Sequence, residues 1–126
     1  MTVRRVAVTG LGILSPVGND KDTFFANLMA GKSGIKRLET DFAVNLDCKI
    51  AAYINDYDPL EHFVKNKAAT MDRVTQFAVS ASQQAINDAG LDLTTENLER
   101  IGVYLGTGMG GAASIEEGYV RLYKEQ

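Results

Sequence analysis

Residues 71–91 read MDRVTQFAVSASQQAINDAGL, and this stretch carries the clearest secondary-structure signal in the chain. Its apolar residues recur at intervals of three and four, which places them on one face of an α-helix running from Met71 to Ala89. The members of that face are Met71, Val74, Phe77, Ala78, Ala81, Ala85, Ile86 and Ala89. Several are alanines, so another segment can approach this face closely. Gly90 predicts a Schellman-type end to the helix, with Leu91 placed for the accompanying hydrophobic contact.

Three β-rich segments lie outside this helix. Val3–Thr9 lacks polar alternation, which is typical of a strand covered on both faces. Lys49–Ile54 gives a weaker strand signal, and Ile101–Leu105 places its apolar residues on one face. These three segments predict a sheet.

Further helices are indicated by their end signals. Asn19 or Asp20 is a candidate N-cap for a helix that runs to about Ala30, and Gly31 supplies its C-terminal stop. A short helical turn is expected from Thr94 or Thr95 through Glu99. Ser114 and Glu117 have the spacing of a capping box for a last helix. The alternation of strands and helices predicts an α/β architecture.

The composition bounds the class of protein. The chain has 126 residues, of which 45% are hydrophobic and 23% are charged, as in ordinary globular domains. A net charge of −3 gives no overall attraction to nucleic acid or to an anionic membrane. No apolar run approaches the roughly 20 residues that span a bilayer. Arg4 and Arg5 precede an apolar stretch, but Gly10 and Gly12 interrupt it and no cleavage site follows, which favours a buried strand over a signal peptide.

The chain has one cysteine and one histidine. Cys48 alone excludes an intrachain disulfide and a zinc site with the usual cysteine count, and it favours a reducing compartment. We interpret Cys48, between Asp47 and Lys49, as a structural thiol rather than a nucleophile, and His62 as a surface or helix-end residue. No metal site and no cofactor are predicted.

A glycine-rich loop, GTGMGG, occupies Gly106–Gly111 between a predicted strand and a predicted helix. Gly106, Gly108 and Gly111 have the spacing of a dinucleotide-binding turn. The acidic partner expected about 20 residues later would be Glu125, which falls inside a predicted helix rather than at a strand end. We therefore favour tight backbone packing, or close approach to an acyl substrate, over nucleotide binding.

Several segments, taken in order, resemble one family, the β-ketoacyl-acyl-carrier-protein synthases of the type II elongating kind. The chain matches the opening segments of this family, its long helix and its glycine-rich strand end. The matching residues are 4–12, 14–19, 30–35, 71–72, 88–91, 100–102 and 106–111. The resemblance covers essentially the whole chain.

The resemblance implies that residues 1–126 are an incomplete N-terminal portion of a thiolase-like fold, a layered α/β structure with a mixed sheet. It also implies a homodimer that catalyses decarboxylative Claisen condensation of an acyl thioester with malonyl-carrier protein. The catalytic cysteine and two histidines of the family lie beyond the matched region. No catalytic residue is therefore expected in this chain.

Two local features carry over from the family. Met109, flanked by Gly108 and Gly110, matches a bulky residue that lines the acyl pocket. Lys65 and Lys67 fall where the family has basic residues that meet the acidic acyl-carrier protein. That basic cluster is thinner here, because residues 68–70 are uncharged.

Two alternatives to a synthase remain at this point. A non-catalytic partner of the chain-length-factor kind shares the scaffold but lacks the nucleophile, and a nucleotide-binding α/β module would use the glycine loop instead. With no membrane or nucleic-acid signal, the expected location is the cytoplasm.

Overall fold

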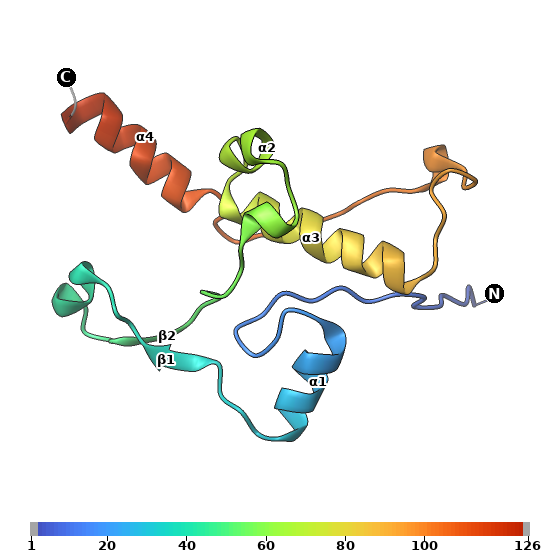
Figure 1. Cartoon of the computed structure of the whole chain (residues 1–126), viewed down its shortest axis with the longest axis horizontal. Helices are drawn as coiled ribbons and strands as arrows, with labels where there is room; N and C mark the ends of the chain where they lie inside the picture. The colour runs from blue at the N-terminus through green and yellow to red at the C-terminus, as the bar shows by residue number, and fades with distance from the viewer. Residues whose placement is uncertain (1–2, 125–126) are drawn as a thin grey trace.

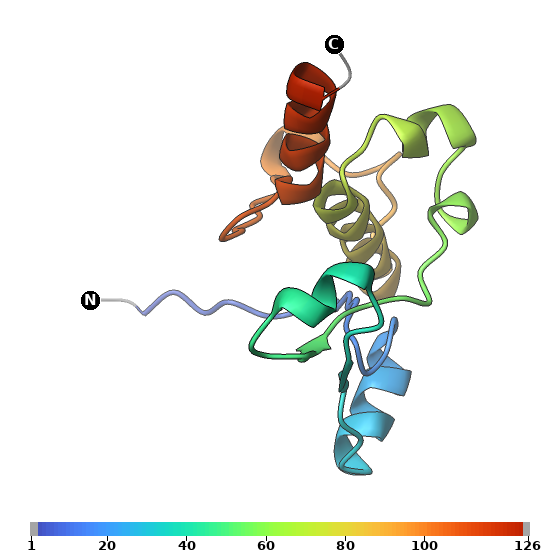
Figure 2. The ribbon, with the colours of Figure 1, turned by 90° about the vertical axis from the view of Figure 1, so that its left-hand side faces the viewer.

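The computed structural model describes residues 3–124, and one long helix lies at its centre (Figure 1). The described elements follow one another as α1 (Lys21–Met29), β1 (Ile35–Arg37), η1 (Asp41–Asn45), β2 (Ile50–Ala52), η2 (Pro59–Glu61), α2 (Lys65–Ala69), α3 (Arg73–Asp88), η3 (Leu98–Arg100) and α4 (Ala112–Lys124). Helices α1 and α4 lie at opposite ends of the molecule in both ribbon views (Figures 1 and 2).

Helix α3 ends at the glycine as its sequence predicts, but it begins at Arg73 rather than at the predicted Met71. Asp72 is the N-cap, and its Oδ1 accepts the backbone N–H of Val74 at 3.0 Å. At the other end Gly90 has φ +66°, and the N–H of Leu91 donates to the carbonyl of Ile86. This is the Schellman arrangement, and it stops the helix where the glycine stands.

The most buried side chains of α3 are polar, whereas the apolar face predicted from the sequence is at best half-buried. Gln76 and Ser80 are 8% and 4% exposed. The Gln76 amide donates to the carbonyls of Ala68 and Met71, and the Ser80 hydroxyl lies 2.8 Å from the Tyr57 hydroxyl. Their burial is tolerated because these polar groups are hydrogen-bonded.

The N-terminal segment crosses α3 at its alanine face, as the alanine content predicts. A Cβ built on Gly12 would lie 1.8 Å from the carbonyl oxygen of Ala81, and one built on Gly10 would lie 2.2 Å from that of Ala85. Only glycine permits so close an approach of two backbones. The crossing therefore depends on matched small residues in both segments.

Helix α1 is held against the C-terminal end of α3. Asp20, one of the two predicted N-caps, accepts the N–H groups of Asp22 and Thr23 at 3.0 and 2.8 Å. The ammonium of Lys21 pairs with the carboxylate of Asp88 in the last turn of α3. Gly31 ends α1 with φ +67°, as predicted.

The strands differ from the sequence prediction. Ile35–Arg37, which was not predicted, pairs antiparallel with Ile50–Ala52, inside the predicted 49–54 segment. Residues 3–9 and 101–105 belong to no strand, so the prediction of strands there is wrong for this structure. A strand exists only where a neighbouring backbone supplies its hydrogen bonds, and among residues 3–124 no segment pairs with either one. The described residues therefore combine helices with one small sheet.

Two predicted helix starts after α3 also differ from those in the structure. Asp92 caps a turn through Thr94, and the following one-turn helix η3 is capped by Asn97 rather than by Thr94 or Thr95. Helix α4 begins at Ala112, two residues before Ser114. The predicted capping box is thus wrong, because the Ser114 side chain is already inside the first turn.

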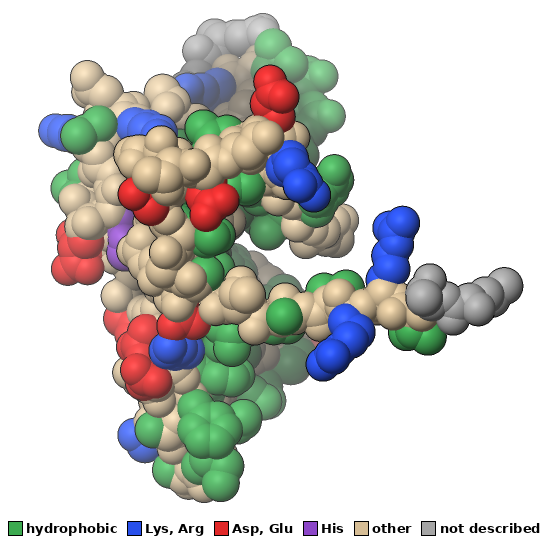
Figure 3. Space-filling view, turned by 90° about the vertical axis from the view of Figure 1, so that its right-hand side faces the viewer, with side chains coloured by type: hydrophobic (Ala, Val, Ile, Leu, Met, Phe, Trp, Pro, Cys, Tyr) green, Lys and Arg blue, Asp and Glu red, His purple; other side chains and the backbone are tan. Residues whose placement is uncertain are grey.

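Much apolar surface is exposed. The buried hydrophobic residues among those described are Ala43, Tyr57 and Ala68. In Figure 3 hydrophobic side chains gather below the N-terminal segment, which projects to the side of the molecule. Within residues 3–124, no helix combines the length and the apolar character needed to cross a bilayer.

Candidate functional site

The glycine loop, residues 106–111, lies against the first turn of α3. A Cβ built on Gly110 would lie 3.1 Å from Cγ1 of Val74 and 3.0 Å from Cγ2 of Thr107, so the loop backbone packs directly on these side chains. Gly111 has φ +79°, a left-handed conformation that leads into α4. The loop thus has one packed side, and Gly106 and Gly108 face open space.

A single carboxylate joins the starts of α3 and α4. While Oδ1 of Asp72 caps α3, its Oδ2 accepts the Ser114 hydroxyl at 2.5 Å. The Ser114 hydrogen bond, followed by the Val74 N–H, lowers the pKa of Asp72 below its ordinary value. Both partners favour the ionised carboxylate because they donate to it.

Met109 projects from the loop beside the apolar face of α4. Its side chain is 77% exposed. It borders a groove of about 480 Å³ whose other walls come from α4: Ala112, Ile115, Glu116, Tyr119, Val120, Tyr123 and Lys124. The rings of Tyr119 and Tyr123 stack with centroids 6.0 Å apart along this groove. The predicted pocket residue therefore stands at the edge of an apolar surface.

A second apolar hollow, of about 380 Å³, borders the start of the loop. It is bounded by three segments: residues 12–14 of the N-terminal segment, the α3 side chains of Val74, Phe77, Ala78 and Ala81, and residues 105–107. Met109 is not among its lining residues. The two ends of the glycine loop thus line two different apolar hollows, and Val74 contributes both to this hollow and to the support of the loop.

The two predicted docking lysines share a short helix of their own. Lys65 and Lys67 are exposed on α2, while Ala68 on the same helix is 7% exposed and lies against Gln76 of α3. The contact at Ala68 fixes α2 to α3, so that both ammonium groups are presented to solvent.

The single thiol and the single imidazole lie on different segments. Cys48 is exposed in the connection before β2, and its thiol donates to the carbonyl of Ile50 at 3.5 Å. His62 is exposed at the end of η2, as predicted, and it stacks on Tyr57 with ring centroids 5.0 Å apart. Neither has the partner that a nucleophile or a general base needs in hydrogen-bonding reach.

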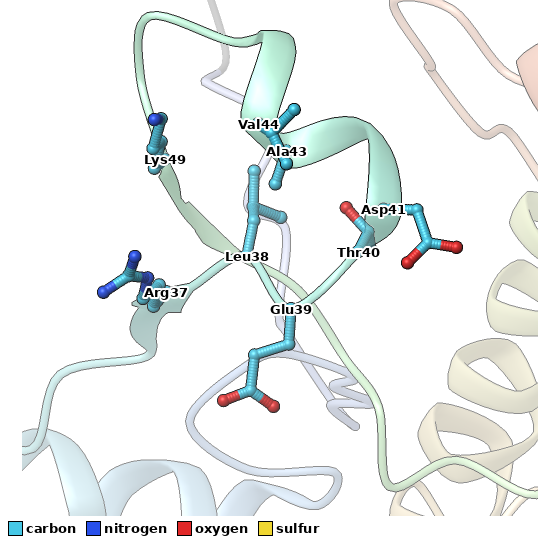
Figure 4. A pocket seen from close by; sticks show the side chains of 8 residues that line it. All are labelled: Arg37, Leu38, Glu39, Thr40, Asp41, Ala43, Val44 and Lys49. Carbon is cyan, nitrogen blue, oxygen red and sulfur yellow. The ribbon is translucent and has the colours of Figure 1, made fainter.

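A further pocket, of about 410 Å³, lies between η1 and the small sheet (Figure 4). Leu38 is at its centre, with Arg37 and Lys49 on one side and Asp41 on the other. Because charges of both signs surround it, the pocket favours neither an anion nor a cation. The described residues also contain no cluster of three metal-ligating side chains.

The polar contacts that join the N-terminal segment to α3 were not predicted from the sequence. Gln84 of α3 accepts the Ile13 N–H at 2.9 Å and donates to the Asn19 carbonyl at 2.7 Å, and Asp88 accepts the Leu11 N–H. No local sequence pattern predicts hydrogen-bond partners that lie 65 or more residues apart in the chain. Glu125, considered above as a ribose-binding residue, lies outside the described residues.

Comparison with known proteins gives one consistent result. The family model "Beta-ketoacyl synthase, N-terminal domain" matches residues 3–126. A 3-oxoacyl-(acyl-carrier-protein) synthase 2 from Vibrio harveyi is 41% identical over 125 residues, which are 99% of this chain and 30% of that protein. Proteins of the same name from Synechocystis sp. and Staphylococcus aureus are 40% identical over 114 residues and 35% identical over 119 residues, covering 90% and 94% of this chain but 27% and 29% of theirs. The chain thus spans under a third of the length of these relatives.

Proposed function

Because this chain belongs to the β-ketoacyl synthase family, as an N-terminal domain of that family, we propose that the full-length protein is a 3-oxoacyl-acyl-carrier-protein synthase. The observation that carries this proposal is the match over residues 3–126, together with relatives of that name at 35–41% identity. The fold we propose for the full-length protein is thiolase-like, with this chain as the incomplete first part of its domain. In that fold residues 3–9 and 101–105 would be strands.

The proposed reaction is a decarboxylative Claisen condensation. An acyl group carried as a thioester on a cysteine is attacked by the carbanion that malonyl-carrier protein forms when it loses carbon dioxide. A carbon–carbon bond forms, the thioester carbon–sulfur bond breaks, and the thiolate is released. The nucleophile and the two histidines would come from the part of the protein outside this chain, in a cytoplasmic homodimer.

A first experiment tests the activity and its division between the two parts of the protein. Purified full-length protein is incubated with acyl- and malonyl-carrier protein, and product and protein masses are measured. We expect a 3-oxoacyl product and an acyl adduct outside residues 1–126, and neither product nor adduct with the 126-residue chain. An acyl adduct on Cys48 would contradict the assignment, and binding of the carrier without condensation would indicate a non-catalytic partner.

In the proposed enzyme, Met109 with Gly108 and Gly110 forms part of the acyl pocket. Support comes from the exposed thioether at the edge of an apolar groove and from the flexible glycine backbone on both sides. Methionine is unbranched and polarizable, so it can fill a pocket or turn aside. Each added methylene that is buried contributes about 0.8 kcal/mol, roughly a fourfold change in relative rate.

We therefore expect Met109→Ala to shift preference toward longer acyl chains and Met109→Phe to shift it toward shorter ones. Relative kcat/KM across a ladder of acyl-carrier substrates measures this. If both variants lowered activity by one common factor at every chain length, Met109 would be a packing residue only.

Lys65 and Lys67 are the proposed contacts for the acidic carrier protein. Their support is exposure on a helix that is fixed to α3 through Ala68. Replacing both by glutamate should weaken carrier binding, more at low salt than at high salt, because exposed charges are screened. Unchanged binding at low ionic strength would show that these lysines are ordinary solvent-exposed residues with no part in carrier binding.

A further inference from the structure

The Asp72 carboxylate accepts two hydrogen bonds, one at the start of each of two helices. One oxygen caps α3 through Val74, and the other accepts the Ser114 hydroxyl at 2.5 Å. Within residues 3–124 this is the one side-chain hydrogen bond that connects α4 to another element. Asp72 is thus a bridge between the starts of two helices.

Two contacts, one of them the bridge, hold the end of the loop that carries Met109. From α3 the loop is supported at Gly110, which packs on Val74, two residues beyond the N-cap. From α4 it is fixed at Ser114, in the first turn of the helix. Between these two points lies Gly111, whose left-handed backbone decides the direction in which α4 leaves the loop. Loss of the Ser114 contact would therefore free the start of α4 to shift, and with it the groove wall that faces Met109.

We propose that Asp72 is a positioning residue for acyl-chain selection, acting through the Ser114 hydroxyl to fix the glycine loop and the α4 wall of the Met109 groove. The inference rests on the proposed function, since it deepens the role given to Met109. Asp72 does not touch the acyl chain in this scheme. Its effect on selectivity is transmitted by the position of the loop.

The test uses the full-length protein and separates the two tasks of the carboxylate. Ser114→Ala removes the bridge and leaves the α3 cap intact. Asp72→Ser keeps an N-capping oxygen, because serine is a good N-cap, but supplies one short side-chain oxygen instead of two. Ser114→Thr keeps the hydroxyl and is the conservative control.

We expect Ser114→Ala and Asp72→Ser to change the ratio of kcat/KM between long and short acyl chains by roughly two- to tenfold. The double variant should change it no further than either single one, since the two residues act through one bond. Ser114→Thr should restore the ratio of the unaltered protein. A loss of stability alone would not reproduce this pattern of selectivity, non-additivity and rescue.

A second readout is independent of activity. Amide hydrogen exchange of residues 108–115 should quicken in Ser114→Ala and Asp72→Ser but not in Ser114→Thr. If exchange there is unchanged, or if Met109→Ala shifts selectivity while the bridge variants do not, the proposal is wrong. If exchange quickens but Met109→Ala leaves selectivity unchanged, the bridge positions the loop and the pocket role of Met109 fails instead, which overturns the selectivity part of the proposal.

Discussion

The N-terminal segment and helix α4 both meet α3, and they do so in opposite ways. The N-terminal segment lies in backbone contact with the alanine face, through Gly10 and Gly12, and donates backbone hydrogen bonds to Gln84 and Asp88. Helix α4 touches α3 through the loop before it and the Ser114 bridge, and its apolar face remains uncovered. The first contact extends along the alanine face of α3, whereas the second is confined to the start of α3, at Val74 and Asp72.

This difference separates the surfaces that are paired within residues 3–124 from those that are not. A close backbone contact needs both of its partners, and residues 3–124 contain both, the N-terminal segment and α3. The exposed face of α4 and the unpaired residues 101–105 have no such partner within the described part of the chain. In relatives more than three times as long, ample chain exists to cover them.

The largest expected effect comes from breaking the crossing. Gly12→Ala places a Cβ where the Ala81 carbonyl stands, 1.8 Å away, and should lower the free energy of unfolding by at least about 3 kcal/mol, the upper end of typical overpacking costs. Urea unfolding measures this change. A stability loss under about 1 kcal/mol would mean that the backbones separate easily and that the crossing is loose.

Gly118→Ala on α4 is the matched comparison, because its added Cβ would meet nothing within 4 Å. Alanine in a helix interior should stabilise by about 0.5–1 kcal/mol relative to glycine. Destabilisation at Gly118 in the full-length protein would instead show that this side of α4 is closely packed there.

An intermediate effect is expected from the hydrogen bonds that hold the N-terminal segment. Gln84→Ala removes the acceptor of Ile13 and the donor to Asn19, and should cost about 1–3 kcal/mol. Gln83→Ala is the control, since the Gln83 amide reaches only Asn87 on its own helix. Equal melting temperatures for the two variants would contradict a special role for Gln84.

The smallest effect concerns the pH dependence of the contact that Asp88 makes with Lys21 and Leu11. The hydrogen bond from Lys21, followed by that from the Leu11 N–H, lowers the pKa of Asp88. A carboxyl whose pKa is depressed by folding adds stability above its unfolded pKa near 4, and this contribution is lost as the pH falls through the lower folded value.

Asp88→Asn should therefore reduce the loss of stability on acidification below about pH 4, measured as urea midpoints across a pH series. The difference between the two proteins should shrink in high salt, because the pair is partly exposed. Parallel pH profiles at low salt would show that the Lys21–Asp88 pair does not contribute.

The same division explains what sequence reasoning could reach. The start of α1 and the C-terminal ends of α1 and α3 were predictable because a capping aspartate or a terminal glycine acts on backbone groups only a few residues away from it. The alanine face likewise predicted that another segment packs closely against α3. These are local signals.

The missed features are those whose partners are distant or unseen. Residues 3–9 carry a strand composition, yet strand formation depends on a neighbouring backbone. Ser114 fits a capping box by spacing, but its hydroxyl is taken by a carboxylate 42 residues upstream. For the candidate site, Met109 and the two lysines came from resemblance, and the bridge that holds the loop came only from the structure.

The hydrogen bond between Leu11 and Asp88 joins residues 77 positions apart. On a ribosome adding roughly 5–20 residues per second, about 4–15 s must pass between the synthesis of these two residues. During that interval the valine-rich N-terminal segment has been made but the helix that receives it has not. The N-terminal segment thus cannot reach its place until α3 has been synthesised, so the order of synthesis makes this contact a late step of folding.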